Sequence, residues 1–424
     1  MPINLKQKYM NCHPDSNISF TVGYDNRIRF SNGTKATFID DYSDRESLRC
    51  DFLKTALQGD CLGKKMLDSS VKLDFQPEYS YQDMIGYSLR RSLDKGVLNE
   101  GRHYLGKIFC FTNYYCNNNC EYCFGGEKTK RKNFSLNELE HMIEDLSSEY
   151  REIHFGGGEP TLFKGLEHLI EFSKKRNLSA WLLTNGRRFS YRNFAKEIID
   201  SGLDGMIVCL NSHIAQIHDS LTQRQGSFKE TVSGIRNLMA LGFKNFDIIL
   251  IINRKNYKDL KATAQFLAGE GIGGVAFESL VYVGNAAKNI QTLGVKLKDT
   301  AIYIQDALDV LIEKNLKVRI TSFPLCLFKS RYWKYFINRR YEVLATNFSH
   351  ADGGCLYHRY KSSGLRLSVK CLECRLKTFC AGAWESYYYF YSDEEFRPIK
   401  NISNEEILSL VSSHSVNFAL APAK

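Results

Sequence analysis

No stretch of this 424-residue chain stays apolar for eighteen residues, the length at which a membrane-spanning helix is first considered. The opening residues, Met1 to Lys6, also lack the apolar segment of a secretory signal. We therefore expect a cytoplasmic protein with no membrane partner. The length exceeds one typical domain, and 43% hydrophobic residues are enough for a sizeable core, so more than one domain is expected.

A disulfide framework is not indicated, although the chain has thirteen cysteines. Several of them fall in short clusters that are typical of metal sites, which need reduced thiols. The formal charge of +10 fits either an anionic partner or a lysine-rich surface. No RNA-binding module is recognisable, so a nucleic acid partner is not expected. The cysteines outside the clusters are interpreted as small buried hydrophobes: Cys12, Cys50, Cys61, Cys110 and Cys209.

The first cluster is formed by Cys116, Cys120 and Cys123. Three thiolates suit an iron-sulfur cluster, and a four-iron cluster held by only three of them keeps one iron open to a small molecule. The same spacing could be the buried stripe of a helix, but three consecutive asparagines after Cys116 favour a loop. Structural zinc is a further alternative, although it requires a fourth ligand and none lies nearby in the sequence.

A second motif is the apolar run from Ile153, which ends in Gly-Gly-Glu-Pro at residues 157–160. Glycines let a backbone approach a ligand closely, and an acceptor at a strand end can bind an amine. Standing alone, the motif could be an ordinary strand-to-helix turn. With the three cysteines, and with an aromatic residue before the third, it resembles the signature of the radical S-adenosylmethionine (SAM) enzymes. The resemblance implies a [4Fe-4S] cluster on Cys116, Cys120 and Cys123 whose open iron binds SAM, and a cofactor site that includes Tyr122, Gly157, Gly158 and Glu159.

Between residues 105 and 323, short apolar runs alternate with amphipathic segments, which is typical of repeated βα units and a parallel sheet. The predicted strands are 107–112, 151–156, 179–184, 205–210, 246–252 and 274–280. The predicted helices are 135–150, with a capping box at Ser135 and Glu138, then 164–176, 191–201, 228–241, 257–270 and 299–314. Six such units fit the partial (β/α)6 barrel that the family resemblance implies, an α/β fold.

Barrel enzymes place function at the carboxyl ends of their strands. The resemblance therefore adds polar residues at those ends to the SAM site, although each is also an ordinary turn residue: Thr184, Asn211, Ser212 and Asn253. The pair His218 and Asp219 invites a general-base interpretation, but a capped helix entry is preferred and no catalytic role is assigned.

The third part of the chain, residues 324–424, contains Cys371, Cys374 and Cys380. Their spacing resembles that of the SPASM or shorter twitch domains, which hold auxiliary clusters behind many radical SAM barrels. The full SPASM pattern has a further cysteine where this chain has Trp384, so one auxiliary [4Fe-4S] cluster is expected instead of two. Its fourth ligand is Cys326 or Cys355, and Cys326 is favoured because it lies in the turn leaving the barrel. A zinc site remains the alternative.

The first part, residues 1–104, carries no chemical motif, and a helix is predicted from Tyr81 to Val97. In the family with which the resemblance is drawn, this layout often modifies ribosomally made peptides, so we expect a peptide maturase whose first part recognises the peptide's leader. An external one-electron donor such as a flavodoxin or ferredoxin would serve it. The alternatives are a sugar or amino-sugar dehydrogenase or epimerase, and RNA modification.

Overall fold

The computed structural model describes two compact units, Met1–Asp94 and Lys95–Lys424. The described residues are 19–22, 27–31, 36–41, 73–74, 106–125, 133–148, 150–337, 343–349, 355–360, 364–377, 379–403, 406–407 and 410. The helix predicted for 81–97 and the cysteines at 12, 50 and 61 lie outside these ranges. Within them, no helix is long and apolar enough to cross a membrane.

The first unit contains a four-stranded sheet with the strand order β3-β2-β1-β4. Strands β1 (Ser19–Val22), β2 (Arg27–Ser31) and β3 (Ala36–Asp41) pair antiparallel in succession. Strand β4 (Leu73–Asp74) pairs parallel with β1. Among the described strands, β3 and β4 are therefore the edges of this sheet.

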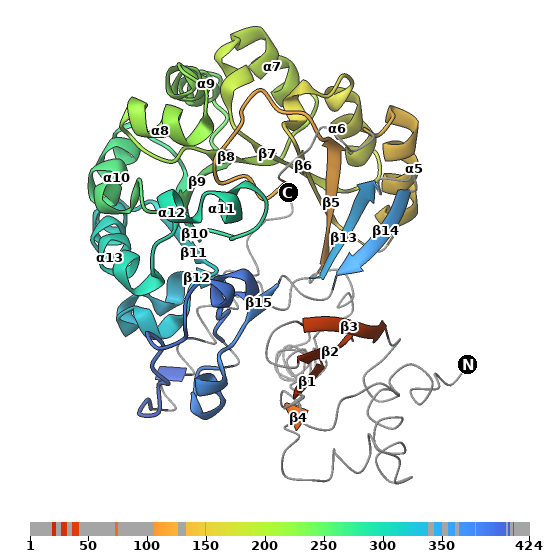
Figure 1. The fold of residues 1–424 in the computed structure, drawn as a ribbon. Helices are drawn as coiled ribbons and strands as arrows, with labels where there is room; N and C mark the ends of the chain where they lie inside the picture. Colours follow the sequence, from red (N-terminus) through yellow and green to blue (C-terminus); the bar gives the residue numbers. More distant parts are fainter. Residues whose placement is uncertain are drawn as a thin grey trace. The chain divides into compact units, whose positions relative to one another are not determined.

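The second unit is built on a ten-stranded sheet surrounded by helices (Figure 1). The six predicted strands are present and lie side by side in chain order, each parallel to the next. They are β5 (Gly106–Asn113), β6 (Glu152–Gly157), β7 (Ser179–Thr184), β8 (Gly205–Cys209), β9 (Phe246–Ile252) and β10 (Gly274–Ser279). The predicted α/β fold of a radical SAM partial barrel is thus confirmed.

Four further strands extend this sheet beyond the six predicted ones. Next to β10 come β11 (Lys317–Thr321) and β12 (Phe336–Ile337), both parallel. On the other edge, β13 (Val343–Ser349) pairs parallel with β5 and forms an antiparallel pair with β14 (Cys355–Tyr360). Residues after the predicted barrel boundary at 323 therefore add strands to both edges of the barrel sheet.

The helices follow the predicted pattern and lie on the outer side of the curved sheet in Figure 1. The capping box is confirmed, because the Glu138 backbone N–H donates to Ser135 Oγ at 3.3 Å while the Ser135 N–H donates to Glu138 Oε2 at 2.7 Å. The predicted helices correspond to α5 (Leu136–Ser147), α6 (Leu166–Lys174), α7 (Arg192–Asp200), α9 (Ser227–Ala240), α10 (Leu260–Gly269) and α13 (Leu297–Glu313).

Shorter elements complete the second unit. The α-helices are α8 (Ala215–Thr222), α11 (Asn285–Lys288) and α12 (Ile290–Leu293), and a small sheet pairs β15 (Leu365–Arg366) with β16 (Ala383–Trp384). The 3-10 turns are η2 (Pro160–Leu162), η3 (Arg187–Ser190), η4 (Tyr257–Asp259), η5 (Leu325–Leu327), η6 (Ser330–Tyr335), η7 (Val369–Glu373) and η8 (Glu385–Tyr389).

The main core lies between the sheet and its outer helices. Buried side chains on successive strands include Phe155, Leu182, Val208 and Ile248, and every residue of β10 is buried. Burial on both faces is what covered parallel strands require, and it explains their continuous apolar runs. The carboxyl ends of β5 to β10 consequently meet along one edge of the sheet, where the predicted site residues fall.

Candidate active site

The three cysteines of the first cluster lie in the loop that follows β5, at the carboxyl end of that strand. Cys116, Cys120 and Cys123 are half-buried and belong to no helix, so the helix-stripe alternative is wrong. A backbone bond from Cys123 N–H to Cys120 C=O at 3.2 Å closes a turn. The Asn118 N–H lies 3.4 Å from Cys116 Sγ, where it can donate to the sulfur. Backbone donors of this kind are usual around the sulfurs of iron-sulfur clusters.

Backbone and amide hydrogen bonds attach this loop to helices far along the chain. The N–H groups of Asn119 and Glu121 donate to the last carbonyls of α8, Thr222 at 3.0 Å and Leu221 at 2.9 Å. Asn285, the first residue of α11, donates its N–H to Cys123 C=O at 2.9 Å and its Nδ2 to Cys120 C=O at 3.1 Å. The geometry of the cysteine loop is therefore held from two sides.

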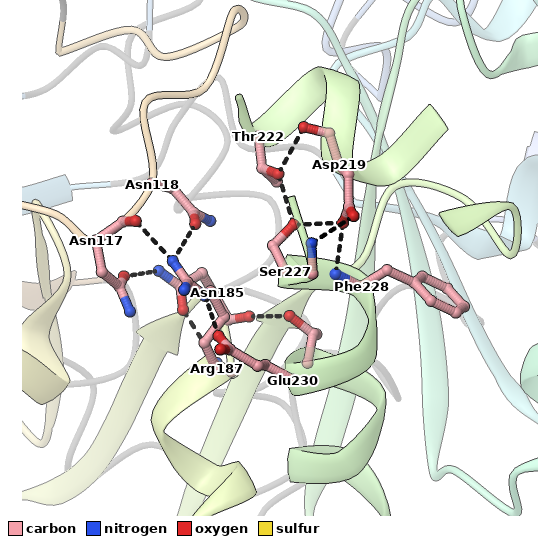
Figure 2. Close-up of polar contacts among 12 residues, drawn as sticks. Asn117, Asn118, Asn185, Arg187, Asp219, Thr222, Ser227, Phe228 and Glu230 are labelled. Carbon is pink, nitrogen blue, oxygen red and sulfur yellow. Dashed lines mark hydrogen bonds and ion pairs between the residues drawn. The ribbon is translucent and has the colours of Figure 1, made fainter. Parts of the chain in front are cut away.

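A further attachment comes from the turn after β7, which Figure 2 shows facing the same loop. Arg187 Nη1 donates to Asn117 C=O at 2.6 Å and to Asn118 Oδ1 at 2.8 Å, while its Nε forms an ion pair with Glu230 on α9. Asn185 Nδ2 donates to Asn117 Oδ1 at 2.7 Å and lies 3.8 Å from Cys116 Sγ. Arg187 and Glu230 could not be predicted from the sequence. No local pattern indicates that an arginine after β7 will contact Asn117 and Asn118 in the cysteine loop.

The glycines of the Gly-Gly-Glu-Pro motif are required by close approach of the chain to itself. A Cβ on Gly158 would lie 2.0 Å from the Tyr115 carbonyl oxygen, and Gly157 has a φ of +115°. The Gly158 N–H donates to Asn113 C=O at 2.8 Å, and the Glu159 N–H donates to Tyr115 C=O at 2.9 Å. The end of β6 is thereby fixed directly against the start of the cysteine loop.

Glu159 is buried and its carboxylate is already engaged by its own chain. Oε1 accepts from the hydroxyls of Thr161 and Thr184, both at 2.7 Å, and Oε2 accepts from the Asn185 N–H at 2.8 Å. Burial raises the pKa of Glu159, while these hydrogen bonds act in the opposite direction. Glu159 and Thr184 thus join the ends of β6 and β7, and their predicted contacts with SAM remain predictions.

Three of the remaining predicted residues are fully buried at the ends of β8 and β9: Asn211, Ser212 and Asn253. Ser212 Oγ accepts from the Ile214 N–H at 3.0 Å, and Asn253 Oδ1 accepts from the Lys255 N–H at 2.9 Å, so both shape turns. Asn211 is different, since its Nδ2 reaches across to the Tyr122 hydroxyl at 2.7 Å. The fold therefore brings Asn211 and Tyr122 together, 89 positions apart in the chain.

Cys209, at the end of β8, corrects one interpretation. Its sulfur is 3.4 Å from the Tyr122 hydroxyl and 3.4 Å from Asn211 Nδ2, so it belongs to a polar group beside the cysteine loop and is not simply a buried hydrophobe. Cys110, in contrast, is fully buried in β5 as expected.

The His218 and Asp219 pair is structural. The Asp219 carboxylate accepts from the Gly226 and Phe228 N–H groups and from the Ser227 hydroxyl, so it caps the start of α9 (Figure 2). His218 Nδ1 accepts from the Asn211 N–H at 3.3 Å. The preference for a capped helix entry over a general base agrees with this geometry.

The rear cysteines converge with Cys326. Burial, together with the nearby thiols of Cys380, Cys371 and Cys374, raises the pKa of Cys326 to about 12, which places the four thiols in one region. Cys380 Sγ lies 3.4 Å from the N–H of Leu325, the residue next to Cys326, and Cys374 Sγ lies 3.4 Å from the Ile399 N–H. Cys355 is the first residue of β14, opposite Ser349.

Both cysteine groups offer the donor set of a cluster: several thiols with backbone N–H groups directed at the sulfurs. In the described part of the chain, no three His, Cys, Asp or Glu side chains gather closely enough to hold one metal ion. A four-iron cluster does not need such a gathering, because each thiolate binds a different iron.

Comparison with known proteins agrees with this geometry. The Radical SAM superfamily model matches residues 111–267, which span the cysteine loop and the strand ends described above. Residues 111–267 thus carry a Radical SAM domain.

Two curated relatives share part of the sequence. Fe-coproporphyrin III synthase of Methanosarcina barkeri is 28% identical over 245 residues, 57% of this chain and 55% of that protein. Mycofactocin maturase MftC of Mycolicibacterium smegmatis is 26% identical over 160 residues, 37% of this chain and 40% of that protein. The chain thus spans about half the length of the curated relatives it matches.

Two solved structures share the fold at low identity. Streptococcus suis SuiB, bound to its precursor peptide SuiA, has a TM-score of 0.52 at 14% identity, covering 90% of this chain and 97% of SuiB. The enzyme anSMEcpe, with bound AdoMet and a Kp18Cys peptide, has a TM-score of 0.52 at 14% identity, covering 74% and 97%. At this identity the likeness concerns the fold alone.

Proposed function

We propose that this protein is a radical SAM enzyme that matures a ribosomally made peptide. A [4Fe-4S] cluster, when bound and reduced, would supply the electron that cleaves SAM to methionine and a 5′-deoxyadenosyl radical, which abstracts a substrate hydrogen atom. Cys116, Cys120 and Cys123 would hold that cluster through three of its irons. The observation that carries the proposal is the placement of these thiols, in one braced loop beside Gly157 and Gly158 at the carboxyl edge of the sheet.

The chain's own residues would fix the positions of the reactants. The loop is attached to α8, α11 and the Arg187 turn, so the three thiols keep their positions without depending on a mobile segment. The strand ends near it present buried polar groups, including Asn211 and Asn253, as candidates to orient SAM. Preorganised positions of this kind lower the entropic part of the barrier.

The peptide substrate is supported by the relatives and by the layout of the chain. MftC is named a maturase, and SuiB was solved with its precursor peptide. The first unit carries a small sheet in which β3 is an edge among the described strands. An edge strand can pair with an extended peptide, so we assign leader recognition to residues 1–104.

An auxiliary [4Fe-4S] cluster would be held by Cys326, Cys371, Cys374 and Cys380, in a SPASM- or twitch-like region over 324–424. The convergence of these four thiols supports this assignment over one that uses Cys355. Such a cluster could anchor the substrate or accept an electron after hydrogen abstraction. Because the thiols must stay reduced, we place the protein in the cytoplasm. We further assign a flavodoxin or ferredoxin as its electron donor.

A small-molecule substrate is the second candidate, and one observation favours it. The relative with the longest match quoted above, Fe-coproporphyrin III synthase, is named for a tetrapyrrole and not for a peptide. A substrate of that size would need no leader, and the first unit would then serve as a structural cap.

The test is an anaerobic assay of the reconstituted, reduced protein with SAM. We expect 5′-deoxyadenosine from the native protein, none from Cys116→Ala, and native yield from Cys110→Ala, whose thiol is buried in β5. Absence of 5′-deoxyadenosine from the native protein would refute the radical mechanism. A mass change in a short peptide encoded beside the gene would support the maturase, whereas formation of iron coproporphyrin III from a tetrapyrrole precursor, with no change in the peptide, would support the second candidate.

A further inference from the structure

Exposed hydrophobic side chains lie beside Cys123 in the described part of the chain. Phe124, directly after Cys123, is 55% exposed, and Val283, in the turn after β10, is 40% exposed. The two segments touch, since a Cβ on Gly284 would lie 2.4 Å from the Phe124 carbonyl oxygen, and the Asn285 N–H donates to Cys123 C=O at 2.9 Å. These contacts place an apolar surface directly against the cysteine loop.

A third ring extends this surface. Phe390, which follows η8 and is 43% exposed, packs on Tyr282 with the ring centroids 5.7 Å apart. Tyr282 is itself buried and precedes Val283 in the chain. We call Phe124, Val283 and Phe390 the loop patch. Apolar side chains scattered singly on a surface need no explanation, whereas a group of them beside a functional site is typical of a protein contact.

Positive charge accompanies the loop patch. Between Gly125 and Asn133 the sequence has four basic residues and one acidic residue. Both ends of this segment lie at the cysteine loop, because Gly125 follows Phe124 and Asn133 Oδ1 accepts from the Tyr114 N–H at 2.9 Å. Lys288 on α11 is exposed as well. This charge favours a partner with an acidic surface and disfavours a second copy of this chain, whose formal charge is +10.

We propose that the loop patch is the docking surface for an acidic one-electron carrier protein of the flavodoxin or ferredoxin class. This inference rests on the proposed function, which requires one electron for each SAM cleaved. The carrier loses that electron and the cluster gains it, so no further reactant is needed. Electron transfer needs a short path, and the loop patch adjoins Cys123, one of the three proposed ligands. Electron-transfer complexes are typically small and transient, so a few apolar side chains beside positive charge match this kind of partner.

The test compares two reductants on the same reconstituted protein. Phe124→Ser and Val283→Ser should each raise the flavodoxin concentration needed for half-maximal cluster reduction by about fivefold or more, the usual effect of truncating an important interface residue. Reduction by dithionite, a small molecule that needs no docking surface, should keep its native rate, and iron content should be native. The matched control is Ile302→Ser, an exposed aliphatic residue on α13, which should change neither reductant's rate.

Binding is measured separately, by fluorescence anisotropy of labelled, oxidised flavodoxin with the reconstituted, oxidised protein. The affinity should fall in Phe124→Ser and Val283→Ser. For the native protein it should also fall as the ionic strength rises, because charges are screened over a Debye length of about 8 Å at physiological salt. An affinity that does not depend on salt would contradict the acidic partner.

Native flavodoxin dependence in both variants would overturn the proposal, and weaker binding of the candidate peptide in its place would assign the loop patch to the substrate. An equal loss with dithionite would also overturn it, because the cluster itself would then be affected. If Phe124→Ser lost iron through its position beside Cys123, Val283→Ser would decide the question. A native protein that fails to cleave SAM with dithionite would refute the proposed function, whereas cleavage with dithionite and no binding of flavodoxin would refute this inference alone.

Discussion

At the scale of single residues, Gly158 has the least room of the motif residues around the cysteine loop. Alanine at this position would drive its Cβ to 2.0 Å from the Tyr115 carbonyl oxygen, which is backbone and cannot move aside cheaply. Overpacking of this kind typically costs about 1–3 kcal/mol, and we expect Gly158→Ala to be near or above the upper end. Chemical denaturation should show this loss of unfolding free energy. A separate binding measurement should show weaker affinity for SAM.

The control for that experiment is Gly269→Ala at the end of α10. No atom lies within 4 Å of a Cβ built there, and the position does not have a positive φ. Alanine should be neutral or stabilise the protein by up to about 1 kcal/mol, because glycine is a poor helix residue. Equal stability of the two variants would show that the tight contact at Gly158 is not maintained in solution.

His218 gives a prediction about pH. Burial lowers its pKa from the ordinary 6.5 to about 4, so the folded protein keeps the imidazole neutral where the unfolded chain would protonate it. The stability that this histidine contributes is complete above pH 6.5 and is lost as the pH falls towards 4. The loss attributable to it is about 3 kcal/mol.

The measurement is the difference in unfolding free energy between the native protein and His218→Gln across pH 7 to 4. The variant lacks the titrating group, so its stability should fall less steeply than that of the native protein in this window. Parallel curves would mean that His218 is solvated and titrates normally in the folded state.

At the scale of elements, the cysteine loop shows why function gathers at strand ends. It has no regular structure of its own, yet α8, α11 and the turn after β7 each supply donors or acceptors to it. Lys255, after β9, adds an ion pair with Glu121 at 2.6 Å. These neighbouring elements thus hold the loop in one conformation, which keeps its three cysteines where cluster ligands must lie.

The rear elements carry a prediction that separates Cys326 from Cys355. Cys326, in η5, lies with the cysteines of η7 and its flank, so Cys326→Ala should lower iron from about eight to about four atoms per chain. SAM cleavage should persist in this variant while product formation stops, because the first cluster is untouched. Iron analysis and product mass spectrometry provide the two measurements.

Cys355→Ala is the matched control, since Cys355 begins β14 and should keep native iron and product. The reverse result, with iron lost from Cys355→Ala and kept in Cys326→Ala, would transfer the fourth ligand to β14. Zinc in place of the second set of iron atoms would identify the rear site as structural.

At the scale of the whole molecule, the division into two compact units predicts separable roles. A chain that begins at Lys95 keeps all strands of the barrel sheet and all three cysteines of the loop. We expect it to cleave SAM at the native rate but to bind leader-containing peptide at least tenfold more weakly. Anaerobic 5′-deoxyadenosine formation and fluorescence anisotropy with labelled peptide would test the two halves of this prediction.

A truncated chain that fails to cleave SAM, while the full chain does, would contradict this division. The first unit would then act as a structural cap, as a small-molecule enzyme would require. Native peptide affinity without residues 1–94 would move leader recognition to the second unit.

Much of the barrel could be predicted from the sequence because its determinants are local. The apolar runs of β5 to β10 and the amphipathic helices between them are decided within a few residues by burial on one or both faces. The cysteine triplet and Gly-Gly-Glu-Pro are also local, since one loop and one strand end contain them. The resemblance to radical SAM enzymes, and with it the chemistry proposed for the first cluster, followed from these short patterns.

Only the tertiary structure decided the contacts that join distant segments. Three such contacts depend on strand order. Strand β13 pairs with β5, Arg187 donates to Asn117 in the cysteine loop, and Asn211 contacts Tyr122. The same is true of Glu159, which accepts hydrogen bonds from Thr184 and Asn185 at the end of the next strand, and of Cys326, which reaches the rear cysteines through folding. The local sequence pattern determines which residues can be buried and which can bind a metal. The folding of long connecting segments determines which of these residues come into contact.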